Sequence, residues 1–458
     1  MFKFKWRSFR IPLRLALVLS LSFAAVAPIA RTGPIQGSAS LIYEVHSAFS
    51  GRLTHTITTK NPTFDTIIDG KLYVPLVSNK TGSVYVVIIN MTSTAGNLRL
   101  LKDDFGNFYA CWEGIIINPN ETFISRIEYY VVSFETRFFI NASEAMRYNE
   151  NAALYKTFTR SEELIESDAS EIAARAQSLC HDAVNIHERV VRIYDFVISY
   201  LRYDPQEDER GALWALRNRI GDCSEYSYLF VALCRAAGVP ARIQAGFGFH
   251  DLKETTADGH MWAEYYLPDY GWIPVDPTWQ LLDTMDQKHF SSLASMSELM
   301  PYANYCFNFT ADLNSENITD NQEVILEPSP TDLFGNGIVG DTLKTIKTIG
   351  QARLAINVET FLGMPIIFHS EAEQLDQLYA TSEMNLQAAL QQWTANMTAA
   401  RSYVSEALAE ANEASQKAWM LVEYAFALFI GTLVACLSIA YILFRHHTTK
   451  NNWQSTRQ

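Results

Sequence analysis

Three residues of this sequence, Cys223, His260 and Asp276, have the side-chain types that nucleophilic catalysis requires. A cysteine attacks a carbonyl carbon as its thiolate, so it needs a base that removes its proton and a third group that orients the base. Each residue also has a structural explanation: Cys223 could be a small buried apolar residue, His260 a hydrogen-bonded turn residue, and Asp276 a cap before Pro277. The elements that carry the three residues must decide between catalysis and structure.

Cys223 stands at the start of a predicted helix. In "GDCSEYSYLFVALCRAAGVPAR", residues 221–242, a Gly-Asp turn precedes the cysteine, and Gly238 followed by Pro240 marks the helix end. The unpaired N–H groups at a helix N-terminus favour an anion, so the position predicts a lowered pKa for the Cys223 thiol and donors for an oxyanion. Cys234, in the middle of the same helix, is expected to be a core residue.

His260 and Asp276 lie on the two arms of a predicted β-hairpin. Strand-like runs over 260–267 and 272–276 flank the connection "PDYG". In the simplest register position 262 lies opposite 276, so His260 and Asp276 share a face as diagonal neighbours. Together with a thiol on a helix start, this arrangement favours a triad: Cys223 as nucleophile, His260 as base and Asp276 as the orienting acid.

The composition is that of a globular protein with an acidic surface. The chain has 458 residues, 48% of them hydrophobic and 19% charged, which is enough for two or three domains. The formal net charge of -14 argues against a nucleic-acid partner, because phosphate binding needs a basic face. The cysteines show no CxxC pair and no zinc-ligand spacing, so neither a metal nor a cofactor is expected. One or two disulfides remain open among Cys111, Cys180, Cys234 and Cys306.

Two apolar segments predict the topology. Residues 15–30 follow a basic stretch and resemble a secretory signal, and they fall short of the ~20 residues of a membrane span, so cleavage is favoured over an uncleaved anchor. Residues 424–444 carry no charge and are long enough to cross a bilayer. Basic residues flank both segments on their outer sides, which places residues 31–423 outside the cell. Acceptor triplets for N-glycosylation all lie in this exterior region, at Asn79, Asn90, Asn120, Asn141, Asn308, Asn317 and Asn396.

The chain between these segments changes character twice. Short Val-, Ile- and Tyr-rich runs separated by turn signals predict an all-β sandwich, and a mixed α+β region follows. A region without Pro or Gly then predicts a helical stalk, which either self-associates as a coiled coil or folds as one hairpin. The predicted divisions are a signal peptide or N-terminal anchor (1–37), a β-sandwich (38–150), the domain with the triad (151–330), a linker (331–369), the stalk (370–423), a transmembrane helix (424–444) and a cytoplasmic tail (445–458).

The segments around the triad resemble a known family. "GDCSEYSYLFVALCRAAGVPARI" and "HMWAEYYLPDYGWIPVDPTW" are similar to the transglutaminase-like superfamily, and "VVRIYDFVISYLRYD" and "GALWALRNRIGDC" resemble the elements before its cysteine. The similarity covers roughly residues 160–300, and the architecture resembles membrane-anchored archaeal surface members. It implies a papain-like fold with Cys223 as nucleophile, His260 as base and Asp276 as orienting acid. Tyr203 and Trp214 are candidates for the side chain that completes the oxyanion hole in some members.

The resemblance leaves three functions open. Active members share an acyl-thioester intermediate and differ in whether water or an amine accepts the acyl group. The prediction is a cysteine hydrolase acting on peptide or protein amide bonds through Cys223. The alternatives are acyl transfer to amines, which forms cross-links, and a non-catalytic surface protein that binds or scaffolds, because a fold does not by itself imply a function. The expected partners are a peptide or protein substrate and the membrane, bound through the C-terminal helix.

Overall fold

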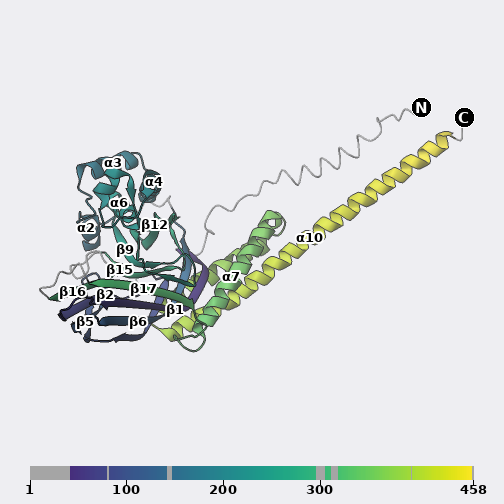
Figure 1. Ribbon diagram of the computed structural model, residues 1–458. Helices are drawn as coiled ribbons and strands as arrows, with labels where there is room; N and C mark the ends of the chain where they lie inside the picture. The colour runs from purple at the N-terminus through teal and green to yellow at the C-terminus, as the bar shows by residue number, and fades with distance from the viewer. Residues whose placement is uncertain are drawn as a thin grey trace, which may run out of the picture. The chain divides into compact units, whose positions relative to one another are not determined.

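The computed structural model describes residues 42–79, 82–141, 147–295, 305–310, 318–393 and 395–455 (Figure 1). The signal segment predicted over 1–37 lies outside the described residues. The chain divides into two compact units, one of Ile42–Leu343 and one that includes Lys344–Gln458. Each unit is described by itself below.

Two antiparallel sheets form the predicted β-sandwich in the larger unit. The strand order is β10-β17-β1-β6-β14 in one sheet, with β3 beside β6, and β16-β2-β5-β4 in the other. Leu53 and Ile127 of the first sheet pack against Leu72 and Trp112 of the second in one apolar core. The strands are β1 (Tyr43–Lys60), β2 (Ile67–Pro75), β3 (Val84–Ser93), β4 (Asn97–Lys102), β5 (Phe108–Ile117), β6 (Thr122–Phe138), β10 (Glu254–Thr256), β14 (Thr284–Met285), β16 (Cys306–Thr310) and β17 (Thr319–Pro328).

Several of these strands come from beyond the predicted sandwich. β17 pairs with β1 from Gly51↔Pro328 to Lys60↔Thr319, and β16 pairs with β2. β10 and β14 come from within the α+β part and pair with β17 and β6. The sandwich is therefore built from strands that come before, within and after the α+β part. The domain limits at 150 and 330 stay predictions, and strands on both sides of the first limit share sheets.

The α+β part is built around α6 (Cys223–Ala236), almost every residue of which is buried. Val190, Ile193 and Val197 of α4 pack with α6 in one core. A five-stranded sheet, β13-β12-β11-β9-β15, covers another side of α6. The elements are α2 (Ala153–Thr159), α3 (Ser170–Cys180), α4 (Ile186–Tyr200), β7 (Arg202–Tyr203), α5 (Ala212–Asn218), β8 (Ile220–Gly221), β9 (Ala241–Gly248), β11 (His260–Leu267), β12 (Gly271–Asp276), β13 (Leu281–Leu282) and β15 (His289–Ala294).

The five-stranded sheet lies between α6 and the sandwich. Phe247 on β9 and Phe290 on β15 belong to the sandwich core, and the Phe247 ring contacts His55 of β1 edge-on at 5.0 Å. Met261 and Ala263 of β11 instead belong to the core around α6. Two apolar faces therefore hold the sheet, and with it the strand that begins at His260.

The second unit is helical. It comprises α7 (Ile338–Phe361) from Lys344 onward, α8 (Met364–Ile367), α9 (His369–Gln392) and α10 (Met397–Ser455). The linker predicted over 331–369 thus contains a long helix, which accommodates Gly340 and Gly350 and buries Ile346 and Ile349. The predicted stalk is α9 plus the start of α10. These two helices run antiparallel, since Asn385 donates to Glu410 at 2.9 Å, and self-association remains a prediction.

One segment of α10 has the properties of a membrane span. Within Met397–Arg445 a window of mean hydropathy 2.4 has none of its residues buried, and it is long enough to cross a bilayer. This helix is consistent with a single-pass anchor at residues 424–444.

Candidate active site

Local hydrogen bonds fix Cys223 at the first position of α6. Asp222 caps the helix by accepting from Ser224 N at 2.9 Å, and Glu225 Oε2 accepts from Asp222 N at 3.1 Å. Ser227 Oγ lies 2.7 Å from Cys223 O and 3.1 Å from Met261 O, so it connects the first helical turn to β11. The Gly-Asp-Cys turn of the sequence therefore sets both the start of the helix and its position against the strand that carries His260.

The thiol of Cys223 is not the lowered-pKa group that the helix position predicts. Burial and the neighbouring Asp222 carboxylate raise the pKa of Cys223 to about 12, although the Met261 N–H acts in the opposite direction. Desolvation of the thiolate therefore outweighs the helix dipole. At neutral pH Cys223 is a thiol, and its reaction requires a base.

His260 and Asp276 are hydrogen-bonded across the hairpin. His260 Nε2 lies 2.8 Å from Asp276 Oδ2, and Asp276 is fully buried. The register pairs Ala263 with Val275, which continues to position 262 opposite 276 and confirms the prediction. Because the Nε2 proton is directed at the carboxylate, the Nδ1 lone pair is the basic site of the neutral ring.

The Asp276 side chain makes both sets of contacts that the sequence leads us to expect, those of a cap and that with a histidine. Its Oδ1 accepts from Thr278 N at 2.8 Å and from Trp279 N at 3.0 Å, and these two hydrogen bonds form the structural cap. Its Oδ2 accepts from His260. Burial alone would raise the pKa of Asp276, but hydrogen bonds from His260 and His289 hold it well below its usual range. The carboxylate is ionised and oriented from both sides.

The His260 ring is enclosed by aromatic neighbours and by a glycine. It stacks on Trp279, with ring centroids 4.6 Å apart, and burial lowers the pKa of His260, so the ring is neutral near pH 7. On the adjacent strand β9, a Cβ at Gly248 would come within 2.7 Å of His260 Cδ2. Gly248 therefore permits the imidazole to lie against the strand.

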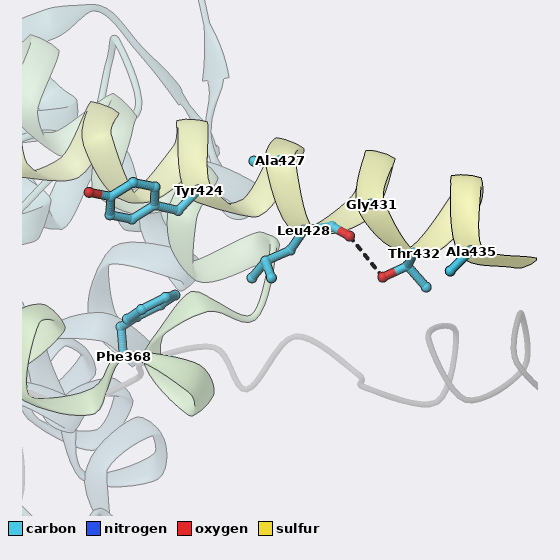
Figure 2. Close-up of a pocket in the computed structure, with 7 residues that line it drawn as sticks. All are labelled: Phe368, Tyr424, Ala427, Leu428, Gly431, Thr432 and Ala435. Atoms are coloured by element: carbon cyan, nitrogen blue, oxygen red, sulfur yellow. Dashed lines mark hydrogen bonds between the residues drawn. The ribbon is translucent and has the colours of Figure 1, made fainter.

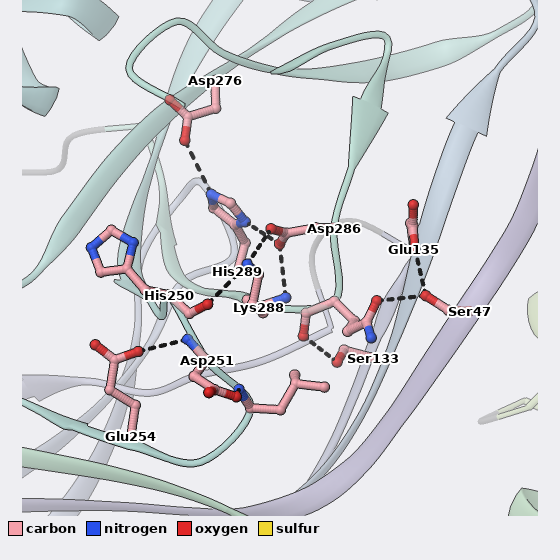
Figure 3. Close-up of polar contacts among 12 residues, drawn as sticks. Ser47, Ser133, Glu135, His250, Asp251, Glu254, Asp276, Asp286, Lys288 and His289 are labelled. Atoms are coloured by element: carbon pink, nitrogen blue, oxygen red, sulfur yellow. Dashed lines mark hydrogen bonds and ion pairs between the residues drawn. The ribbon is translucent and has the colours of Figure 1, made fainter. Parts of the chain in front are cut away.

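A second buried histidine, missed by the sequence analysis, joins the same carboxylate. His289 Nε2 lies 3.1 Å from Asp276 Oδ2, and His289 Nδ1 lies 2.7 Å from Asp286 Oδ1 (Figure 3). His289 reaches the site because β15 pairs with β9, a contact between separate parts of the sequence. The only local signal was a histidine three residues after an aspartate.

A metal ion could fit the spacing of His260, Asp276 and His289. Ligand atoms of His260, Asp276 and His289 all lie within 4.8 Å of one another. However, the hydrogen bonds to the shared Oδ2 account for these contacts, and the second nitrogen of His289 is already engaged with Asp286. We therefore interpret the cluster as a hydrogen-bonded chain.

The two oxyanion-hole candidates lie on different elements. Tyr203 lies on β7 opposite Gly221 of β8, two residues before Cys223. Burial raises the pKa of Tyr203 and the proximity of Cys223 adds to the effect, so the phenol is within electrostatic range of the sulfur. Trp214 lies on α5.

The acidic loop after β7 is anchored to the start of α6. Gln206 N donates to Asp222 Oδ2 at 3.1 Å, and Arg210 N donates to Glu225 Oε1 at 2.8 Å. Glu209 accepts from the Tyr228 hydroxyl, and burial raises the pKa of Glu209 to about 7. The capping residues of the cysteine helix therefore also hold the loop beside it.

A thiol at the start of a buried helix, with a histidine and an aspartate on the adjoining sheet, defines a papain-like α+β domain. Residues 171–277 match the family model of the transglutaminase-like superfamily. The chain thus carries a transglutaminase-like core, and this core contains Cys223, His260 and Asp276, whereas Asp286 and His289 lie beyond the matched segment.

The curated relatives match less than a third of this chain. The protein-glutamine gamma-glutamyltransferase of Pseudomonas aeruginosa is 36% identical over 90 residues, which cover 18% of this chain and 14% of that protein. The human kyphoscoliosis peptidase is 30% identical over 145 residues, covering 28% and 22%. A Cytophaga hutchinsonii structure described as a candidate cysteine protease shares 17% identity with a TM-score of 0.49, covering 64% of this chain and 94% of that one. The chain spans less than a quarter of the length of its curated relatives.

Proposed function

We propose that the protein is a membrane-anchored cysteine hydrolase whose exterior part cleaves amide bonds of peptides or proteins through an acyl-thioester on Cys223. The observation that carries the proposal is the buried His260–Asp276 hydrogen bond of 2.8 Å, formed on the strand that Ser227 ties to the first turn of the cysteine helix. The transglutaminase-like match over the same residues supports it.

The chemistry follows from the protonation states. As Cys223 Sγ attacks the amide carbon, His260 Nδ1 takes the thiol proton and Asp276 stabilises the resulting imidazolium. The oxyanion is stabilised by N–H groups at the start of α6 and by the Tyr203 hydroxyl. When the C–N bond breaks, His260 returns the proton to the leaving amine, which leaves the acyl-thioester. Water then attacks the thioester with His260 as base, releasing the acid and restoring the thiol.

Transfer of the acyl group to an amine is the second candidate function. It uses the same site and the same thioester, with an amine in place of water, and it is supported by the glutamyltransferase name of the Pseudomonas relative. The two differ in product, a free acid or an amide adduct. A peptide amide incubated with the full chain in the presence and absence of a primary amine, with mass analysis of the products, separates them. A non-catalytic binding protein would give neither product.

The test of the nucleophile is chemical labelling of the full chain. Iodoacetamide should alkylate Cys223 faster than Cys180, which is also partly exposed, because His260 accepts the proton of Cys223. His260→Ala should slow the labelling of Cys223 and leave Cys180 unchanged, and a chelator should alter neither. Equal rates at the two cysteines, or a Cys223 rate independent of His260, would exclude Cys223 as the nucleophile.

A further inference from the structure

His289 is hydrogen-bonded to a carboxylate on each side. Its two ring nitrogens lie 3.1 Å from Asp276 Oδ2 and 2.7 Å from Asp286 Oδ1, and the residue is 2% exposed. A neutral imidazole has one N–H, whereas an imidazolium has two. Since ionised carboxylates only accept hydrogen bonds, both contacts are satisfied when His289 is protonated.

The surrounding charges balance around this cation. Asp276 and Asp286 each carry a negative charge, His289 and Lys288 each carry a positive charge, and Lys288 lies 3.5 Å from Asp286 (Figure 3). With His260 neutral, the cluster has no net charge. The His289 ring lies 5.3 Å from the His260 ring, so its positive charge disfavours protonation of His260.

We propose that His289 is a positioning residue which, as a buried imidazolium held by Asp286, fixes the Asp276 carboxylate and keeps His260 in its neutral, basic form. The role deepens the function proposed above and depends on it. It separates into two physical parts. The N–H donor orients Asp276, and the positive charge prevents the full charge of Asp276 from making His260 too basic.

Two substitutions of one residue distinguish the two parts. His289→Gln retains an amide donor but removes the charge, and His289→Ala removes both. The measurement is the rate of Cys223 alkylation by iodoacetamide across pH in the full chain, with circular dichroism as a check of folding. In both variants the acid limb, which reports His260, should move to higher pH by about one unit. Only His289→Ala should also lower the plateau rate, by about tenfold.

A matched control keeps the result interpretable. His187 also pairs with an aspartate, Asp283, at 2.7 Å, so His187→Gln should leave the limb in place. A limb unmoved in both His289 variants would overturn the proposal while leaving Cys223 labelling, and hence the proposed nucleophile, intact. Loss of labelling in the wild-type chain would instead overturn the proposed function.

A separate observation concerns the helical unit, where residues 361–368 form an apolar tip between α7 and α9. This tip, "FLGMPIIF", contains no charged or hydrogen-bonding side chain. Phe361, Ile366 and Ile367 are exposed by 75%, 66% and 60%, respectively. Exposed apolar side chains concentrated in so short a segment are typical of an interaction surface.

The tip lies beside the start of the apolar span. Its last residue, Phe368, packs against Tyr424 with ring centroids 6.0 Å apart, and Tyr424 is the first residue of the uncharged run 424–444. Phe368 and α10 border an apolar groove that continues along the span, lined by Phe368, Tyr424, Ala427, Leu428, Gly431, Thr432 and Ala435 (Figure 2). The exposed Trp419 precedes Tyr424 by about 1.4 helical turns, as in an interfacial aromatic belt.

We infer that the tip inserts into the same lipid surface that α10 crosses, as a second and shallower membrane contact. This inference rests on the proposed anchoring through α10. We assign lipid as the partner of the tip because the exposed tip is continuous with the span at Tyr424 and Leu428, where acyl chains would begin. Two contacts with the bilayer would restrict the tilt of α10, which one helix alone leaves free.

Photo-crosslinking to lipid tests this contact. The full chain is reconstituted in phosphatidylcholine vesicles with benzoylphenylalanine in place of Ile366, of Leu433 in the span, or of Ser405. Ser405 lies on the same helix about 28 Å before Tyr424 and is exposed. Lipid adducts are expected at 366 and 433 but not at 405. An adduct at 433 without one at 366 would overturn the inference alone. No adduct at 433 would overturn both the anchoring through α10 and the inference.

Discussion

At the scale of single residues, Asp276 determines which nitrogen of His260 is basic. Its two oxygens have different tasks, because Oδ1 accepts from two backbone N–H groups and Oδ2 accepts from two histidines. An asparagine in its place would keep its carbonyl oxygen toward the backbone donors. Its NH₂ group would then face His260 Nε2, which could only accept, so the ring proton would move to Nδ1 and block the base.

Asp276→Asn should therefore leave the fold intact and lower kcat by roughly 10² to 10⁴. Turnover of a peptide amide by the full chain measures the effect, and circular dichroism reports the fold. Asp258→Asn is the matched control, because Asp258 is exposed on the loop before His260. Similar losses in the two variants would contradict the role given to Asp276.

The residues that sequence could predict are those whose relation is local. Cys223 follows from the helix start, and the pairing of His260 with Asp276 follows from hairpin register, which the structure confirms. Their catalytic roles remain a prediction. His289 could not be found in this way, because its place beside Asp276 depends on β15 pairing with β9. The raised pKa of Cys223 could not be predicted either, because desolvation of its thiolate depends on the packing of the whole core.

At the scale of elements, β9 sets how closely the His260 ring can approach the strand. Gly248 on this strand faces the His260 ring and pairs with His289. Gly248→Ala would place a methyl group within 2.7 Å of the His260 ring. The stacked Trp279 ring prevents the imidazole from moving away from this methyl group. The close approach of the His260 ring to β9 therefore explains why position 248 is a glycine.

Gly248→Ala should reduce turnover by at least tenfold, because an ångström of misplacement at a reacting group has a large effect on rate. It should also slow alkylation of Cys223, which requires no substrate. Gly340→Ala is the control, since a Cβ at Gly340 meets nothing within 4 Å. Full activity in Gly248→Ala would show that the ring is less constrained than this geometry requires.

The elements themselves were predicted unevenly. Strands β2, β3, β5 and β6 correspond to Val- and Ile-rich runs flanked by turn signals, so the sandwich could be predicted. The contribution of β16 and β17 could not, because the pairing of β17 with β1 joins opposite ends of the larger unit. In the helical unit, helix composition was informative, but the break before α10, which allows α9 to fold back, has no Gly or Pro to mark it.

At the scale of the whole molecule, the buried cation links stability to pH. Burial alone would lower the pKa of His289, but hydrogen bonds to Asp276 and Asp286 raise it to about 9, against 6.5 for an unfolded chain. The protonated form is therefore favoured by folding. Its contribution to the free energy of unfolding is complete below about pH 6.5 and is lost as pH rises through about 9.

The wild-type chain should thus lose stability between pH 7 and 9 relative to His289→Gln, by about 2 kcal/mol if the whole shift contributes. Thermal unfolding of the full chain in detergent at several pH values measures the difference between the two proteins, in which the other titrating groups cancel. Parallel pH profiles would show that His289 is neutral in the folded protein.

The topology of the chain follows from its charges and is open to a direct test. The span 424–444 is uncharged and Arg445 follows it, so the C-terminal end should stay on the cytoplasmic side and the larger unit, with Cys223, outside. Protease added to intact cells should degrade residues 42–343 and spare a tag placed after Gln458, and permeabilised cells should lose the tag as well. Removal of the tag from intact cells would reverse the orientation. It would place the thiol of Cys223 in the reducing cytoplasm, where its substrates would have to be intracellular peptides or proteins.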